Sequence, residues 1–236
     1  TQIAMWRPIG NATTVPAAIG MPAFTTTGFT ATTRAITATN YFTRKRRLGF
    51  VTAATAGSVG HFRIAASQFT LGAAGTTAGG FVYKIQFGES SASLIDGRIA
   101  MGVRTNLTPT NVAPATLTQF IGLGHDDFGL NMNLYYGGTS AQTPIDLGGF
   151  FPVPAIGGYN TDFYELEITA LPNTNDVGIK VTRLNTGHVF QTTLTRTSAA
   201  VLPSETQLLM PWGFLTNHTS AAAAGVDVAA VAIEHF

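Results

Sequence analysis

The sequence predicts an all-β fold, an antiparallel two-sheet β-sandwich. Through most of the 236 residues, short runs rich in β-branched and aromatic residues are bounded by Gly, Asn, Pro, Asp or Ser, which is the pattern of strands joined by turns. Residues 164–168 and 179–184 alternate apolar and polar side chains, so each run should have one buried and one wetted face. Two sheets packed face to face satisfy this pattern within a single domain.

The predicted strands follow one another along the chain and are separated by recognisable turns. Residues 137–138, 172–176 and 185–187 supply the Gly and Asn that hairpin turns favour, so neighbouring strands should be mostly antiparallel. Only residues 90–95 and 110–117 have even a weak helical pattern. The clearest strands are expected over residues 48–53, 62–66, 80–87, 98–103, 119–124, 132–136, 162–170, 178–184, 188–195, 207–215 and 226–236.

The first 43 residues differ in composition from the rest. They are rich in Thr and Ala, are interrupted by Pro8, Pro16 and Pro22, and have no helical period. Trp6 and many other apolar side chains make this segment too hydrophobic for a solvated linker. It should therefore lie against its own sandwich or against a neighbouring subunit. We expect residues 1–43 to be an extended N-terminal arm that docks outside its own sandwich, and residues 44–236 to form the sandwich domain.

The chain carries little charge for its size. It has 13 Lys+Arg, 12 Asp+Glu and a net charge of +1, so 11% of its residues are charged, against roughly 25% in an ordinary soluble domain. We therefore expect other copies of the chain, or a larger particle, to cover much of its surface. The alternative is that Thr, Ser, Asn and Gln side chains solvate it. The near-neutral balance predicts no attraction to nucleic acid, and no apolar run approaches the roughly 20 residues of a membrane span.

One basic cluster stands out against this background. Arg44, Lys45, Arg46 and Arg47 are consecutive, and Arg34 is expected to join them. Such a cluster predicts a contact with another subunit or with the particle. Two alternatives remain open: the charges protect an exposed strand edge from unwanted pairing, or they bind a polyanion.

A short loop gathers oxygen ligands of the kind that calcium prefers. His125, Asp126 and Asp127 are followed by Asn131 and Asn133, although their spacing is not that of an EF-hand loop. Adjacent aspartates repel each other unless a cation or an Arg lies between them, or unless water solvates an exposed turn. Asp126, Asp127 and Asn131 are therefore only weak metal candidates, because a β-turn explains these residues equally well.

Aromatic side chains are the candidates for carbohydrate binding, since a ring covers the apolar face of a sugar. Tyr135, Tyr136 and Tyr159 are the predicted glycan-binding residues, with Trp6 as a further possibility. Alternation places Tyr135 and Tyr136 on opposite faces of a strand, so one ring should be in the core while the other points outward. Trp212 lies in an apolar run and is expected in the core.

No catalytic or cofactor-binding motif is present in the sequence. Glu165 and Glu167 share one face of a strand, which two glycosidase carboxylates would require, but paired Glu on a wetted strand usually serves solubility. No Gly-x-Ser-x-Gly elbow occurs, and the glycine-rich residues 72–80 lack the Lys of a phosphate-binding loop. The absence of Cys excludes disulfides, zinc-thiolate sites and thiol catalysis. We expect no enzymatic activity and no cofactor.

Residues 44–236 resemble a recurring module of tailed-bacteriophage virion proteins, of the tail or minor structural type. The resemblance is carried, in this order, by YFTRKRRLGFV at residues 41–51, FIGLGHDD at 120–127, NMNLYY at 131–136 with IDLGGFFP at 145–152, and VTRLNTGH at 181–188. It implies a β-sandwich of lectin-like jelly-roll type that is part of a virion assembled in the host cytoplasm.

From this resemblance we expect a structural component of a surface appendage, such as a tail fibre, a spike or a head fibre or decoration. It should be a symmetric homo-oligomer, with a trimer preferred, in contact with other virion proteins. The alternative is a module of the appendage that binds a host surface glycan or receptor. A polysaccharide depolymerase is the third hypothesis.

Overall fold

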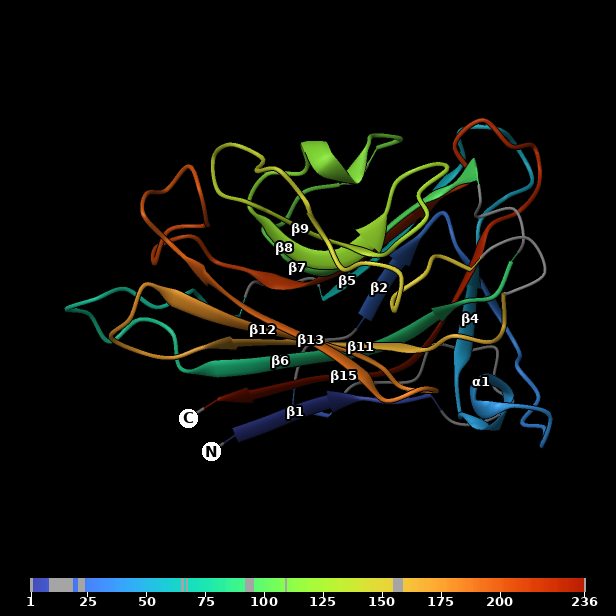
Figure 1. The fold of residues 1–236 in the computed structure, drawn as a ribbon, viewed down its shortest axis with the longest axis horizontal. Coiled ribbons are helices and arrows are strands. Elements are labelled where there is room, and N and C mark those ends of the chain that lie inside the picture. Colours follow the sequence, from blue (N-terminus) through green and yellow to red (C-terminus); the bar gives the residue numbers. More distant parts are fainter. Residues whose placement is uncertain are drawn as a thin grey trace.

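The computed structural model describes residues 2–8, 19–20, 24–64, 66, 68–91, 96–108, 110–154 and 159–235. Within them, two antiparallel sheets pack face to face (Figure 1). The predicted all-β, antiparallel two-sheet sandwich is therefore confirmed.

Each sheet is assembled from strands that lie far apart in the sequence. The eight-stranded sheet has the order β13-β12-β11-β6-β15-β4-β3, with β1 also beside β15. Its strands are β1 (Gln2–Trp6), β3 (Thr30–Thr32), β4 (Leu48–Val51), β6 (Phe81–Glu89), β11 (Tyr164–Ala170), β12 (Asp176–Arg183), β13 (His188–Thr195) and β15 (Gly225–His235).

The seven-stranded sheet has the order β10-β9-β8-β7-β14-β5-β2. Its strands are β2 (Phe24–Thr27), β5 (Val59–Ile64), β7 (Arg98–Arg104), β8 (Phe120–His125), β9 (Asn133–Gly137), β10 (Ile145–Asp146) and β14 (Met210–Thr216). Two short helices complete the described elements, α1 (Tyr41–Arg44) and the 3-10 helix η2 (Pro114–Thr116). Neither has the length or the apolar run needed to cross a bilayer.

The main core lies between the sheets and follows from strand alternation. Along β6, the side chains of Phe81, Tyr83 and Ile85 are buried, whereas those of Lys84 and Gln86 are only half-buried on the outer face. β11 and most of β12 alternate in the same way, as their apolar and polar residues predict. The outer face of the eight-stranded sheet is therefore polar and open.

A second apolar cluster covers the outer face of the seven-stranded sheet. Residues 105–108 and 110–119, which include η2, cross this face (Figure 1) and bury it. Trp212 is fully buried there, its indole Nε1 donates to the carbonyl oxygen of Leu107 at 3.0 Å, and the Arg104 guanidinium lies 4.7 Å from its ring. The prediction that Trp212 belongs to the core is confirmed. Because both faces of β14 are covered, all seven of its residues are buried.

The N-terminal segment is part of the sandwich, which corrects the expectation that it docks elsewhere. β1 pairs with β15, β2 pairs with β5, and β3 pairs with β4. Trp6 is fully buried, with its ring centroid 5.3 Å from that of Phe24 and 6.4 Å from that of Phe50. The segment contains extended strands as predicted, but these strands belong to the two sheets of the sandwich. The boundary at residue 43 therefore does not separate two structural units.

The structure describes in full only one of the two segments predicted to be weakly helical. Residues 110–117 contain only η2, whereas residues 92–95 of the other candidate lie outside the described part of the chain. Residues 41–44, for which the sequence predicts no helix, form α1. Its capping box explains this, because Asn40 Oδ1 accepts from the Thr43 backbone and the Thr43 hydroxyl accepts from the Asn40 backbone.

Candidate functional site

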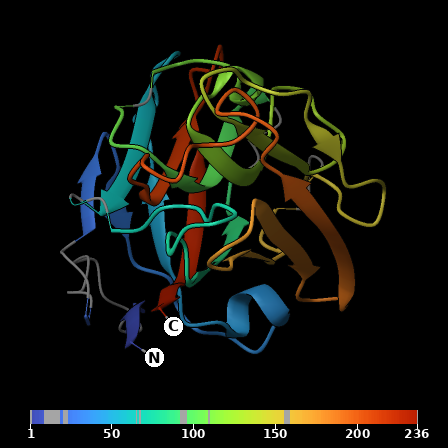
Figure 2. The same ribbon diagram turned by 90° about the vertical axis from the view of Figure 1, so that its left-hand side faces the viewer.

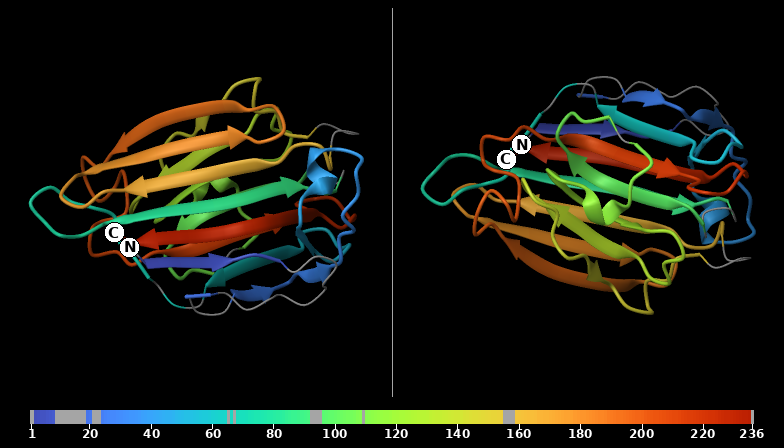
Figure 3. Two further views of the ribbon diagram at one scale, coloured as in Figure 1. Left: turned by 90° about the horizontal axis from the view of Figure 1, so that it is seen from below. Right: turned by 90° about the horizontal axis from the view of Figure 1, so that it is seen from above.

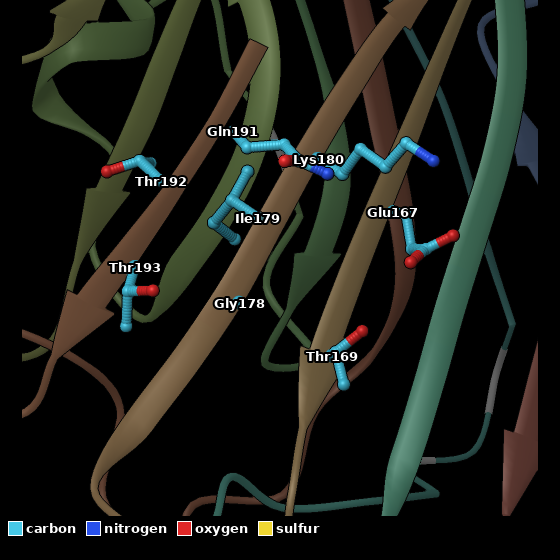
Figure 4. Close-up of a pocket in the computed structure, with 8 residues that line it drawn as sticks. All are labelled: Glu167, Thr169, Gly178, Ile179, Lys180, Gln191, Thr192 and Thr193. Carbon is cyan, nitrogen blue, oxygen red and sulfur yellow. The ribbon is translucent and has the colours of Figure 1, made fainter. Parts of the chain in front are cut away.

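A groove lies on the outer face of the eight-stranded sheet, over β11, β12 and β13. Its main part is a hollow of about 400 Å³. The hollow exists because Gly178, which stands in register with Thr169 and Thr193 on the neighbouring strands, has no side chain to fill it. The residues that line it are Glu167, Thr169, Gly178, Ile179, Lys180, Gln191, Thr192 and Thr193 (Figure 4).

The groove continues toward the end of β11. A second hollow, of about 380 Å³, shares Thr169, Gly178 and Thr193 with the first and extends to Leu171 and Asp176. Leu171 is half exposed there. The two hollows together form one elongated depression with a polar middle and an apolar end.

Hydrogen-bonding groups line this groove. Glu167 is held by the ammonium group of Lys84, 2.8 Å from its Oε2 atom, and this hydrogen bond raises the pKa of Lys84. The side chains of Lys180, Gln191 and Thr193 have no hydrogen-bond partner among the described residues. The groove therefore presents an ammonium, an amide and a hydroxyl group to a ligand.

Glu165 and Glu167 share this outer face, as their spacing predicts. Glu165 Oε2 accepts a hydrogen bond from Gln86 Nε2 at 2.6 Å, while Glu167 is paired with Lys84. Each carboxylate thus has a neutral or cationic neighbour on β6. This is the arrangement of a wetted strand and not that of two opposed catalytic carboxylates.

The predicted calcium ligands separate into two groups. Arg98 lies between the two aspartates: its Nε is 2.7 Å from Asp126 Oδ1, and its terminal nitrogen is 3.1 Å from Asp127 Oδ1. Burial raises the pKa of Asp126, whereas a hydrogen bond with Asp126 lowers the pKa of Asp127. Asn131 instead donates to Asp146 Oδ2 at 3.2 Å. The positive charge between the two aspartates is therefore supplied by Arg98.

Asp96, Asp127 and His218 form a different trio, and this trio has metal-ligand geometry. The Nδ1 atom of His218 lies 3.6 Å from Asp96 Oδ1 and 3.4 Å from Asp127 Oδ2, and the three atoms lie within 4.8 Å of one another. One imidazole and two carboxylates suit a divalent cation. Sequence spacing gives no sign of this trio, because its members come from the segments that precede β7 and follow β8 and β14.

The predicted tyrosine platform is not formed. Tyr135 does point away from the main core, but residues 110–119 cover it, and it is only 3% exposed. Tyr136 is half-buried against the main core, and Tyr159 is half-buried in a turn. Among the exposed rings is that of Phe150, at 66% exposure; its centroid lies 4.6 Å from that of His188. Sequence reasoning missed this pair, because exposure of one Phe in an apolar loop has no sequence signal.

The basic cluster is divided between the interior and the surface. Arg34 and Arg47 each place Nε 2.8 Å from a carboxylate oxygen of Asp227, which is fully buried. Arg34 thus joins the N-terminal segment to β15, and Arg47 joins the turn before β4 to β15, which corrects their assignment to a subunit or particle contact. Arg44 donates to the carbonyl oxygen of Ala38, and Lys45 donates to Gln86 at 3.0 Å. Arg44 and Arg46 are exposed and remain candidates for a contact.

The fold is that of solved lectins. Lectin II from Ulex europaeus superposes with a TM-score of 0.60 at 13% identity, covering 98% of this chain and 97% of that chain. Peanut lectin, solved with a 9-residue peptide, superposes with a TM-score of 0.59 at 11% identity, covering 100% of this chain and 99% of that one. At such identities the similarity establishes the fold alone, a lectin-like jelly roll, as the sequence resemblance implied.

A protein of unknown function from Shewanella oneidensis MR-1 has the same fold, with a TM-score of 0.57 at 11% identity over 99% of this chain and 85% of that chain. No protein-family model matches the chain, and neither does the sequence of any curated protein.

Proposed function

We propose that this chain is a non-enzymatic carbohydrate-binding module on the surface of a bacteriophage particle. The observation that carries the proposal is the open polar groove over Gly178 on a sandwich of lectin-like fold. Two of the solved neighbours are a lectin complexed with galactose and a winged bean lectin with the Tn antigen.

The chemistry of the groove suits sugar hydroxyl groups. Each hydroxyl donates and accepts hydrogen bonds, and the groove offers the Gln191 amide, the Thr193 hydroxyl and the Lys180 ammonium group on adjacent strands (Figure 4). Its elongated outline favours a linear oligosaccharide over a single sugar. The exposed Leu171 at its far end would contact the apolar face of a terminal ring.

Filling the groove should abolish binding. Gly178→Val is a suitable variant, because the backbone at Gly178 is that of an ordinary strand and an added Cβ lies 3.7 Å from Thr169 Cβ, an ordinary van der Waals contact. We expect the purified protein to bind bacterial oligosaccharides on a glycan array and Gly178→Val to lose that signal. Thr25→Val, an exposed strand position on the other sheet, is the matched control. If the unaltered protein binds no glycan, carbohydrate binding is rejected.

The virion location is supported by the four sequence segments that resemble virion proteins and by the scarcity of charge. On the particle, the chain would belong to a tail fibre, a spike or a head decoration that contacts other virion proteins and a host surface glycan. Antibodies raised against the purified protein should label phage particles in electron micrographs. Absence of labelling would reject the location without affecting the glycan-array result.

The alternative function is that of a depolymerase, and one further measurement distinguishes it from a binding module. We expect incubation with the protein to leave the size distribution of a bound polysaccharide unchanged, because Glu165 and Glu167 are engaged by Gln86 and Lys84. Shortened chains would show that the site is catalytic.

A further inference from the structure

β13 is the one long edge strand among those that end the described sheets. At the other edges, β1 has five residues, β2 has four, β3 has three and β10 has two. β13 has eight residues and runs along the outside of the eight-stranded sheet (Figure 3). Short edge strands resist unwanted pairing, whereas a long regular one is a template for another strand.

The outer edge of β13 has unpaired backbone groups, and the structure identifies them. The Arg196 backbone donates to the carbonyl oxygen of Asn175 at 2.9 Å, and this continues the register in which Thr195 stands opposite Asp176. In an antiparallel ladder, alternate residues bond to the same neighbour. The even-numbered residues of β13 therefore bond to β12. Val189, Gln191, Thr193 and Thr195 direct their N–H and C=O groups outward, where no described residue bonds to them.

The side chains of β13 carry none of the usual protection. No Lys, Arg, Asp, Glu or Pro occurs from Val189 to Thr195, and the pairing with β12 is regular throughout, without a bulge. Val189 is 51% exposed. Natural edge strands that must stay single are interrupted by charges, proline or bulges.

A second copy of the same strand is a suitable partner. An antiparallel copy related by a twofold axis at Thr192 would set Val189 opposite Thr195 and Gln191 opposite Thr193. These are neutral pairs, and both members of the first are β-branched residues, which are enriched in strands. No like charges face each other within residues 189–195.

We propose that two copies of this chain pair through β13 around a twofold axis, so that their eight-stranded sheets join into one continuous sheet. Antiparallel pairing of identical strands closes at two copies, so this assembly is a dimer in place of the trimer expected from the sequence. Gln191 and Thr193 also line the groove, so the grooves of the two copies meet at the axis. The pairing does not depend on what the groove binds.

A proline on the outer edge tests the proposal. Thr193→Pro removes an outward N–H group and leaves the even-numbered ladder to β12 intact, while Thr193→Ala keeps the N–H group and is the matched control. We expect the unaltered protein and Thr193→Ala to have a native mass of twice 24.8 kDa by sedimentation equilibrium, and Thr193→Pro to have a mass of 24.8 kDa. Circular dichroism establishes that each variant is folded.

Gln191→Lys is a second variant for the case in which Thr193→Pro does not fold. It places two ammonium groups near the axis, and it should also give a mass of 24.8 kDa. A monomeric or trimeric unaltered protein would overturn the proposal. So would a folded Thr193→Pro or Gln191→Lys variant that remains dimeric.

Discussion

Buried charges in this protein are matched by partners that are distant in sequence. The carboxylate of Asp227 is fully buried, and it is satisfied only because Arg34 and Arg47 reach it from the N-terminal segment and from the turn before β4. Removing one partner of a buried pair typically costs about 3–5 kcal/mol. The basic cluster therefore contributes two of its members to the interior, which neither its density nor its position in the sequence indicates.

The buried pair of His125 and Glu89 makes stability depend on pH. His125 is fully buried, its Nε2 lies 3.0 Å from Glu89 Oε1, and its Nδ1 lies 2.8 Å from the carbonyl oxygen of Asp126. Burial lowers the pKa of His125, but the charge of Glu89 and the two hydrogen bonds outweigh it, so the pKa is raised.

The stabilisation from protonated His125 should therefore be complete below about pH 6.5, the ordinary His pKa. It should be lost as the pH rises through the higher pKa of the folded protein. We expect the free energy of unfolding, measured with urea over a pH series, to fall above this pH in the unaltered protein and to fall less in His125→Gln. A steeper fall in His125→Gln would mean that His125 is buried in its neutral form.

At the scale of elements, β1 should contribute to stability as a strand of the sandwich. Trp6 is fully buried and contacts the rings of Phe24 and Phe50, so Trp6→Ala should lower the free energy of unfolding by about 3–5 kcal/mol. Ile3 on the same strand is 60% exposed, and Ile3→Ala is the control, with an expected change within about 0.5 kcal/mol. Equal effects in urea unfolding would mean that β1 does not pack as described.

The strands of the core could be predicted from the sequence because alternation is a local property. β6, β11, β12 and β13 lie where the sequence places them. The N-terminal strands could not be assigned, since β2 and β3 have four and three residues and owe their existence to partners on β5 and β4. α1 was missed because its capping box competes with a basic run that otherwise suits a strand.

The site was predictable only in part, for the same reason. The shared face of Glu165 and Glu167 follows from strand periodicity, but the groove depends on Gly178 standing between Thr169 and Thr193 across three strands. The burial of Tyr135 depends on residues 110–119, whose path over the sheet is a tertiary property. Strand periodicity predicts on which face of the sheet a side chain lies, but not which segment covers that face.

At the scale of the whole molecule, the scarcity of charge gives a prediction about salt. Pairing through β13 uses backbone groups and neutral side chains, so the native mass should be the same at low salt and at about 1 M NaCl, where the Debye length is about 3 Å. Light scattering across a salt series measures this. A mass that falls as salt rises would indicate a contact through the exposed Arg44 and Arg46 instead.

The position of β15 also determines when the fold can be completed. This strand pairs with β6 on one side and with β4 and β1 on the other, so it holds the middle of its sheet, and the described ends of the chain lie side by side (Figure 2). Non-local strand pairing of this kind is slow. During synthesis, the edges of β1, β4 and β6 that pair with β15 remain unpaired until β15 has left the ribosome. The unfinished chain is thus the form of this protein most in need of chaperones.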